Sequence, residues 1–154
     1  MKRAPGLEKA LQKAIDGVGR KRVADELRLL ASSASGADVL TIVVNEGIHV
    51  LSRKYQRGEV FAASRGSMDF STPASIKKEY EKALRRTARK LKERAWQTIY
   101  IVPFGPTTLA MQIKLLVYRI CGIESIDVAH LGGNTRADIE FDLRRIAQRS
   151  QTPA

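Results

Sequence analysis

The chain is poor in the residues that build disulfides and metal centres. Its 154 residues include one cysteine and two histidines. Cys121 cannot form a disulfide within the chain, and with His49 and His130 it cannot supply the ligands of an ordinary structural zinc site. We therefore predict no metal site, and the sequence identifies no cofactor. Cys121 ends an apolar stretch next to Gly122, which is typical of a buried structural thiol.

Long apolar runs are also missing. No stretch approaches the roughly 20 apolar residues of a membrane-spanning helix, and the N-terminus lacks the apolar core of a signal peptide. We therefore expect no transmembrane segment and a cytoplasmic location. The length is that of one domain. Homo-oligomerisation is left open by the sequence.

Acidic residues are scarce relative to basic ones. The chain has 16 Asp and Glu against 27 Lys and Arg, a formal net charge of +11. Such an excess favours polyanionic partners, which include nucleic acid, acidic membrane surfaces and phosphate-rich ligands. Composition alone does not choose among them.

The most basic stretch is a predicted helix from Ser71 to Arg94. A hydroxyl residue before Pro73 is typical of a capped helix start, and apolar residues then recur at helical spacing to Leu91. The opposite side of this helix is basic. A solvated helix face is one interpretation, and contact with a polyanion is the other. The candidate polyanion-binding residues are Lys78, Lys82, Arg85, Arg86 and Arg89.

Short β-branched runs alternate with helical patterns along the rest of the chain. Two strands joined through one helix form a parallel βαβ unit, which residues 98–131 match. We therefore predict a small three-layer Rossmann-like α/β domain at 36–150, whose mainly parallel sheet is flanked by helices. A helical segment at 1–35 is expected to pack on it, and 151–154 form a frayed tail. The predicted strands are 38–44, 59–63, 98–104 and 123–131, the helices 109–120 and 136–149, and 48–54 is left open between strand and helix.

Ligands of open α/β sheets bind beyond the carboxyl ends of the strands. In the loop after residues 98–104, Gly105 permits close backbone approach, and the N–H groups of Thr107, Thr108 and Leu109 would point at an anion. A nucleotide-containing or phosphorylated small molecule is therefore the expected partner. A simple capped helix start is the alternative. The predicted ligand-binding residues are Asn45, Glu46, Gly105, Pro106, Thr107, Thr108 and Asn134.

Three titratable residues are candidates for catalysis. His130 ends a predicted strand before a double glycine, where it could act as a general base or bind a phosphate, or simply bond a loop carbonyl. Asp138 and Glu140 are the candidate catalytic carboxylates, although acidic residues near a helix start also stabilise the helix dipole. Asp127 is expected to face away from His130, because residues three apart on a strand lie on opposite sides.

Several short motifs resemble one enzyme family. Gly105-Pro106-Thr107, Asp127 with His130, and Asp138-Ile139-Glu140-Phe141 are similar to the C-terminal part of the GT-D type of bacterial glycosyltransferases. The similarity spans 98–142, with 132–137 as extra sequence, and the family's N-terminal Asp-x-Glu segment has no counterpart. The resemblance implies a Rossmann-like fold and transfer from a nucleotide sugar, assisted by His130 and a carboxylate. The alternatives are a basic nucleic-acid-binding protein without catalysis and a nucleotide-sensing Rossmann-like domain.

Overall fold

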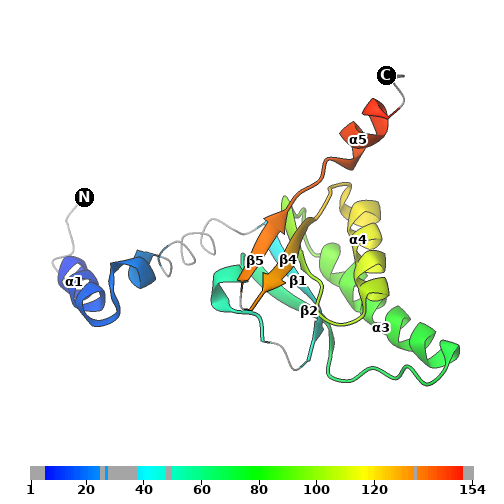
Figure 1. Cartoon of the computed structure of the whole chain (residues 1–154), viewed down its shortest axis with the longest axis horizontal. Helices are drawn as coiled ribbons and strands as arrows, with labels where there is room; N and C mark the ends of the chain where they lie inside the picture. The colour runs from blue at the N-terminus through cyan, green and yellow to red at the C-terminus, as the bar shows by residue number, and fades with distance from the viewer. Residues whose placement is uncertain (1–5, 25–26, 28–37, 48–49, 134, 151–154) are drawn as a thin grey trace.

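The structure is a computed structural model of the chain, and it describes residues 6–24, 27, 38–47, 50–133 and 135–150. Its centre is a five-stranded sheet of order β2-β1-β3-β4-β5 (Figure 1). The first four strands in this order are parallel, and β5 is antiparallel to β4. The predicted α/β class with a mainly parallel sheet is confirmed. The strands are β1 (Val39–Glu46), β2 (Glu59–Arg65), β3 (Thr98–Val102), β4 (Ile126–Gly132) and β5 (Thr135–Ile139).

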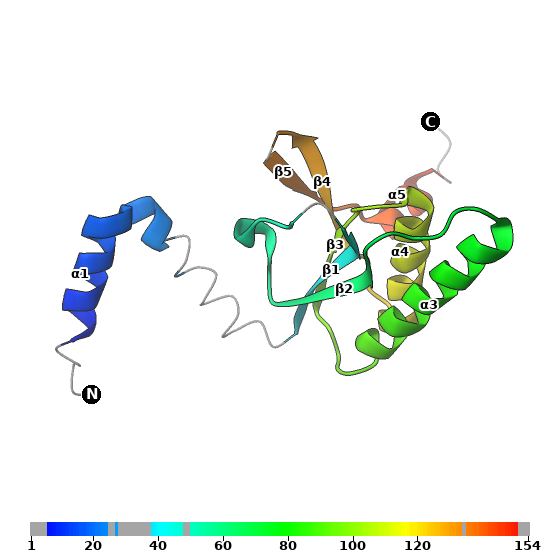
Figure 2. The same ribbon diagram turned by 90° about the horizontal axis from the view of Figure 1, so that it is seen from below.

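Two helices, α3 (Pro73–Leu91) and α4 (Thr107–Cys121), lie side by side on one face of the sheet (Figures 1 and 2). Both match predicted helices. The Thr72 hydroxyl accepts a hydrogen bond from the Ser75 N–H, which caps α3 as its sequence indicates. Gly122, in the left-handed conformation, ends α4.

The sheet has a hydrophobic core on each face, because successive side chains of a strand point to opposite faces. Leu40, Ile42 and Val44 of β1 pack towards α3 and α4, against buried side chains such as Ile113. Val43 packs on the other face with Leu51 and Tyr55. Coverage of both faces explains the continuous apolar run of β1.

The face opposite α3 and α4 is covered by the connection between β1 and β2. This connection contains a single 3-10 turn, η1 (Arg53–Tyr55), in the region that the sequence left open. Tyr55 is buried, and its hydroxyl bonds both the N–H and the carbonyl of Arg136 in β5. The Tyr55 hydroxyl therefore ties the β1–β2 connection to the edge strand β5.

The predicted final helix from Arg136 is wrong in its first half. Thr135–Ile139 is strand β5, and the helix α5 (Leu143–Arg149) starts only after Asp142, whose side chain caps it. Gly132 and Gly133 both have positive φ, so the chain reverses tightly and returns as an antiparallel strand. Helical spacing of later apolar residues concealed this hairpin.

The N-terminal segment contains the helix α1 (Leu7–Val18), as expected from its apolar periodicity. From Lys9 to Val18, the Ile15 side chain is half-buried and the others are exposed. Packing of segment 1–35 on the domain stays a prediction, and the tail 151–154 lies outside the described residues. None of the described helices combines the length and apolar character that crossing a membrane requires.

Candidate functional site

The carboxyl ends of β1 and β3 form the topological switch point of the sheet, because the chain continues from these two strands in opposite directions across the sheet. From β1 the chain passes to β2 on one side, whereas from β3 it passes to β4 on the other. The connection after β1 covers the Tyr55 face, and the one after β3 leads to α4 on the opposite face. Ligands of open α/β sheets bind in the crevice at such a switch point.

A cavity of about 400 Å³ lies at this point, and we call it the carboxyl-edge cavity. Its volume is within the range of small-molecule sites. Three of the predicted ligand-binding residues, Asn45, Glu46 and Gly105, lie in its wall. The described residues that line it are Asn45, Glu46, Gly47, Gly66, Ser67, Phe104 and Gly105.

Asn45 and Gly105 touch each other across the ends of β1 and β3. Gly105 has φ +87°, and a Cβ atom built on it would lie 2.7 Å from the Asn45 Cβ. The Asn45 amide donates to the Gly66 carbonyl (3.1 Å) and accepts from the Ser64 hydroxyl (3.1 Å). The side chain of Asn45 therefore fixes the rim of the cavity by joining three strand ends.

Glu46 lies at the mouth of the cavity in an exposed ion pair. Its carboxylate is 2.7 Å from Arg65 Nε at the end of β2. The Glu46 carbonyl also accepts from the Gly66 N–H (3.0 Å), which continues the β1–β2 pairing beyond the strands. Within the described ranges no cluster of three or more His, Cys, Asp and Glu side chains could hold a metal ion.

The start of α4 lies next to the cavity but outside its lining. Pro106 is the N-cap, and Thr107 and Thr108 are exposed in the first turn. The Thr108 hydroxyl hydrogen-bonds the Tyr80 hydroxyl of α3 (2.6 Å). The Leu109 N–H donates to the Pro106 carbonyl (3.1 Å), so the expectation that it points freely at an anion is wrong.

His130 lies near the carboxyl end of β4 and is not among the residues that line the carboxyl-edge cavity. It is exposed and pairs with Arg136 in the β4–β5 hairpin. Asp127 forms an ion pair with Lys114 of α4 (2.6 Å), whereas Val128 packs on the Tyr55 face. Strand alternation thus places His130 on the face opposite Asp127, as the sequence predicts.

The two candidate catalytic carboxylates have different surroundings from those expected. Asp138 is in β5 and not near a helix start, and its carboxylate is 2.8 Å from Arg57. The Arg57 guanidinium also lies over the Tyr100 ring, 4.4 Å from its centroid. Glu140 is exposed in the segment between β5 and α5. The contacts of Asp138 tie β5 to the β1–β2 connection. Asn134 lies outside the described residues.

Comparison with known proteins gives no assignment. Neither the protein-family models, nor the curated proteins, nor the solved structures contain a significant match to this chain. The site is therefore interpreted from its own geometry.

The basic side of α3 divides into two parts. Lys78, Arg85 and Arg89 are exposed, and Arg85 pairs with Glu81 one turn earlier (3.6 Å). Lys82, which is also exposed, and Arg86 line a second cavity of about 240 Å³ together with Ser64, Arg65 and Glu79, which we call the basic pocket. The segment 64–67 separates this pocket from the carboxyl-edge cavity, because its residues contribute to both walls.

Lys90 belongs to the protein interior rather than to the exposed basic side. Its ammonium group bonds Glu59 at the start of β2 and Glu93 at the end of α3. Burial lowers the pKa of Lys90, but the bonds to the two carboxylates outweigh it, so the pKa is raised above its ordinary value. Lys90 thus fastens α3 to the edge strand.

The substitution Glu59→Gln tests how much the ion pair between Lys90 and Glu59 stabilises the fold. We expect a loss of about 1 to 2 kcal/mol in the free energy of unfolding, because the largely buried Lys90 ammonium and the Arg94 guanidinium (3.0 Å) both lose a charged partner. A group with a raised folded-state pKa stabilises fully below its unfolded pKa and loses that effect as pH rises through the folded pKa. The difference between wild type and Glu59→Gln should therefore be constant at neutral pH and shrink above about pH 10.5. Urea denaturation at pH 7 and pH 11 measures it, and a pH-independent difference would contradict it.

Sequence reasoning missed the contribution of the 64–67 segment to the site. Gly66 and Ser67 line the carboxyl-edge cavity, and Ser64 bonds Asn45. A usable signal was present, because this segment follows the predicted strand 59–63 and parallel strands deliver their carboxyl ends to one edge.

Proposed function

We propose that this domain binds a phosphorylated small molecule, such as a nucleotide, in the carboxyl-edge cavity. The observation that carries the proposal is the position of a cavity of about 400 Å³ at the topological switch point of a parallel sheet. Its rim is fixed before any ligand arrives, because the Asn45 amide bonds Gly66 and Ser64. A preformed rim lowers the ordering cost of binding.

Basic side chains near the cavity favour a phosphate group. Arg65, Lys82 and Arg86 line the basic pocket on the other side of segment 64–67. The net charge of +11 adds a long-range attraction for anions. A phosphate that bridges the two cavities would also compete with Glu46 for Arg65, whose ion pair is exposed and therefore weak.

Phe104 contributes an apolar part of the wall of the carboxyl-edge cavity. The ring is almost fully buried, and the Arg136 guanidinium lies 4.5 Å from its centroid. Arginine at this distance holds the ring in place through a cation–π contact.

We limit the proposal to binding. Transfer of a sugar, which the resemblance to GT-D enzymes implies, would need a catalytic group at the bound phosphate. His130 lies in the β4–β5 hairpin and Asp138 is paired with Arg57, and both lie outside the cavity lining.

Blocking the cavity should abolish binding. We expect ADP, UDP or UDP-glucose to raise the melting temperature of the wild type, and Ser67→Phe to remove this shift by filling the cavity. Ser71→Phe, an exposed position outside the lining, is the matched control and should keep the shift. Differential scanning fluorimetry with inorganic phosphate as a further ligand measures both. No shift with any nucleotide, or equal shifts in the two variants, would exclude the site.

The exposed basic residues of α3 favour nucleic acid as a second candidate partner. Lys78 and Arg89 are exposed on the same helix, away from the carboxyl-edge cavity. Nucleic-acid binding through them would weaken steeply with salt and would fall in Lys78→Glu and Arg89→Glu, but not in Ser67→Phe. Electrophoretic shift of short DNA and RNA at two salt concentrations separates this result from nucleotide binding.

A further inference from the structure

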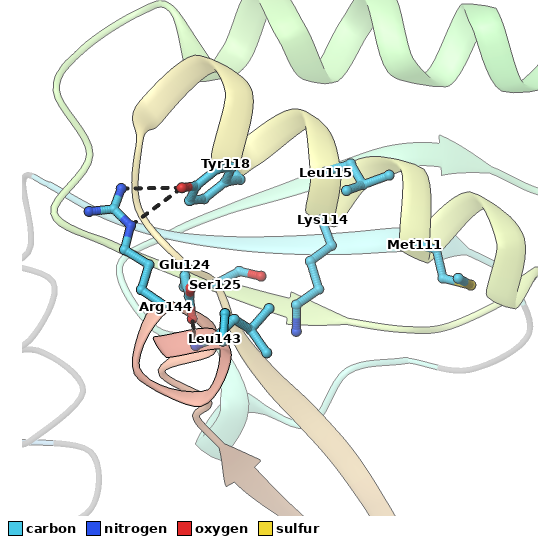
Figure 3. A pocket seen from close by; sticks show the side chains of 9 residues that line it. Met111, Lys114, Leu115, Tyr118, Glu124, Ser125, Leu143 and Arg144 are labelled. Atoms are coloured by element: carbon cyan, nitrogen blue, oxygen red, sulfur yellow. Dashed lines mark hydrogen bonds between the residues drawn. The ribbon is translucent and has the colours of Figure 1, made fainter. Parts of the chain in front are cut away.

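A third cavity opens at the amino end of β4, between α4 and α5. It has a volume of about 480 Å³, and we call it the α4–α5 pocket. It reaches Ser125, which immediately precedes β4, so it lies at the amino end of that strand. Figure 3 shows the α4 side chains Met111, Leu115 and Tyr118 along one wall and Leu143 of α5 near the other.

The wall of the α4–α5 pocket is strongly apolar and exposed. Met111, Leu115 and Leu143 are 60%, 54% and 50% exposed. Their neighbour Ala147 completes an apolar lining that spans both helices. Such a concave apolar surface of this volume is typical of a small-molecule site rather than of a solvated helix face.

One buried hydroxyl in the α4–α5 pocket lacks a partner. Ser125 is 3% exposed, and its Oγ atom makes no hydrogen bond with any described residue. Burial of an unpaired hydroxyl is unfavourable, so buried polar groups are nearly always bonded. An unsatisfied hydroxyl in the lining of an open cavity is therefore an independent sign that a polar atom of a ligand belongs there.

The two basic side chains of the pocket carry more N–H groups than their hydrogen bonds within the protein use. Lys114 uses one of its N–H groups on Asp127, and Arg144 uses two on the Tyr118 hydroxyl. The Glu124 carboxylate accepts from the Leu143 N–H (2.9 Å) and is the acidic group of the described lining, against the two basic groups Lys114 and Arg144. Donors in excess select a ligand whose head group is an acceptor.

We propose that the α4–α5 pocket binds a small amphiphile with an aliphatic body and a carboxylate head. The body lies against Met111, Leu115, Leu143 and Ala147, and the head accepts hydrogen bonds from Ser125 and from Lys114 or Arg144. This site is separate from the carboxyl-edge cavity and does not depend on the function proposed for it.

Decanoate, kept below its micelle-forming concentration, is the probe. Isothermal titration of the full chain should show saturable binding to one site. Ser125→Ala should weaken decanoate binding about three- to tenfold through loss of one hydrogen bond, without lowering the melting temperature of the free protein. A lower melting temperature with unchanged affinity would overturn the role of Ser125. Decanol should bind more weakly than decanoate, and equal affinities would overturn the carboxylate head.

Matched surface variants test whether decanoate binds in the α4–α5 pocket. Leu115→Glu places a charge in the pocket and should abolish decanoate binding, whereas Leu131→Glu, at a 62% exposed position of the β4–β5 hairpin, should retain it. Met111→Glu replaces Leu115→Glu if the latter does not fold. Equal behaviour of the pocket and hairpin variants would overturn the site. Binding to phosphatidylglycerol vesicles without binding of decanoate would identify a membrane surface instead and also overturn it.

Discussion

Gly58→Ala should destabilise the protein by about 3 kcal/mol or more. Gly58 has φ +59°, and a Cβ atom there would lie 2.1 Å from the Val39 carbonyl oxygen. The clash is with backbone that is paired on both sides, because Val39 is in register with Thr98 and Leu40 with Glu59. Relief would require displacement of the central strand. Urea denaturation followed by the fluorescence of Trp96, the single and buried tryptophan, measures the loss.

Gly122→Ala separates the conformational cost from the clash. Gly122 also has positive φ (+69°), but a Cβ atom there meets open space. We expect a loss of about 1 kcal/mol, the cost of a left-handed alanine. If Gly122→Ala and Gly58→Ala are equally destabilising, the close approach of Gly58 to β1 is refuted.

Gly105→Ala should combine a loss of stability with a loss of nucleotide binding. The substitution adds a left-handed alanine at φ +87° and brings its Cβ within 2.7 Å of the Asn45 Cβ. A Cβ atom cannot rotate away, so either β1 or the turn after β3 must shift. We expect about 2 to 3 kcal/mol lower stability and loss of the nucleotide-induced rise in melting temperature. Both are measured on one protein by denaturation and by fluorimetry.

Gly47→Ala is the control within the same cavity wall. Its nearest neighbour for an added Cβ is the Asn45 amide nitrogen at 3.9 Å, an ordinary contact, and its φ is outside the left-handed region. Stability and nucleotide binding should both persist in this variant. Should Gly105→Ala bind nucleotides as well as Gly47→Ala does, the contact between Asn45 and Gly105 has no part in the site.

The sequence was most informative where a segment's own pattern decides its structure. The run 38–44 is mostly apolar and β-branched, and all of it but Asp38 lies in β1, in the middle of the sheet. Thr72 before Pro73 predicted the start of α3, because a cap and a fixed proline φ are local features. The hairpin after β4 was missed because pairing with β4, a tertiary contact, overrides the helical spacing of 136–149.

The candidate site was predicted in part. Asn45, Glu46 and Gly105 were expected at the carboxyl edge and line the cavity there, since parallel strands end on one side. His130 also lies near a strand end, but the β3–β4 pairing stops at Ile101 and Asp127, and the hairpin beyond belongs to β4 and β5. The end of a strand predicts at which edge of the sheet the next residue lies. It does not predict how far that strand pairs with the neighbouring strand.

The amino-acid sequence by itself determined the α/β class, the start of the basic helix α3 and the edge of the sheet where the cavity-lining residues Asn45, Glu46 and Gly105 collect. These follow from periodicity, caps and the direction of parallel strands, which act over a few residues. Only the tertiary structure decided that Asn45 touches Gly105, that Lys90 is bound by Glu59 and that the buried Ser125 hydroxyl has no partner among the described residues. Each depends on packing between elements far apart in the chain, and local residue patterns do not encode those distances.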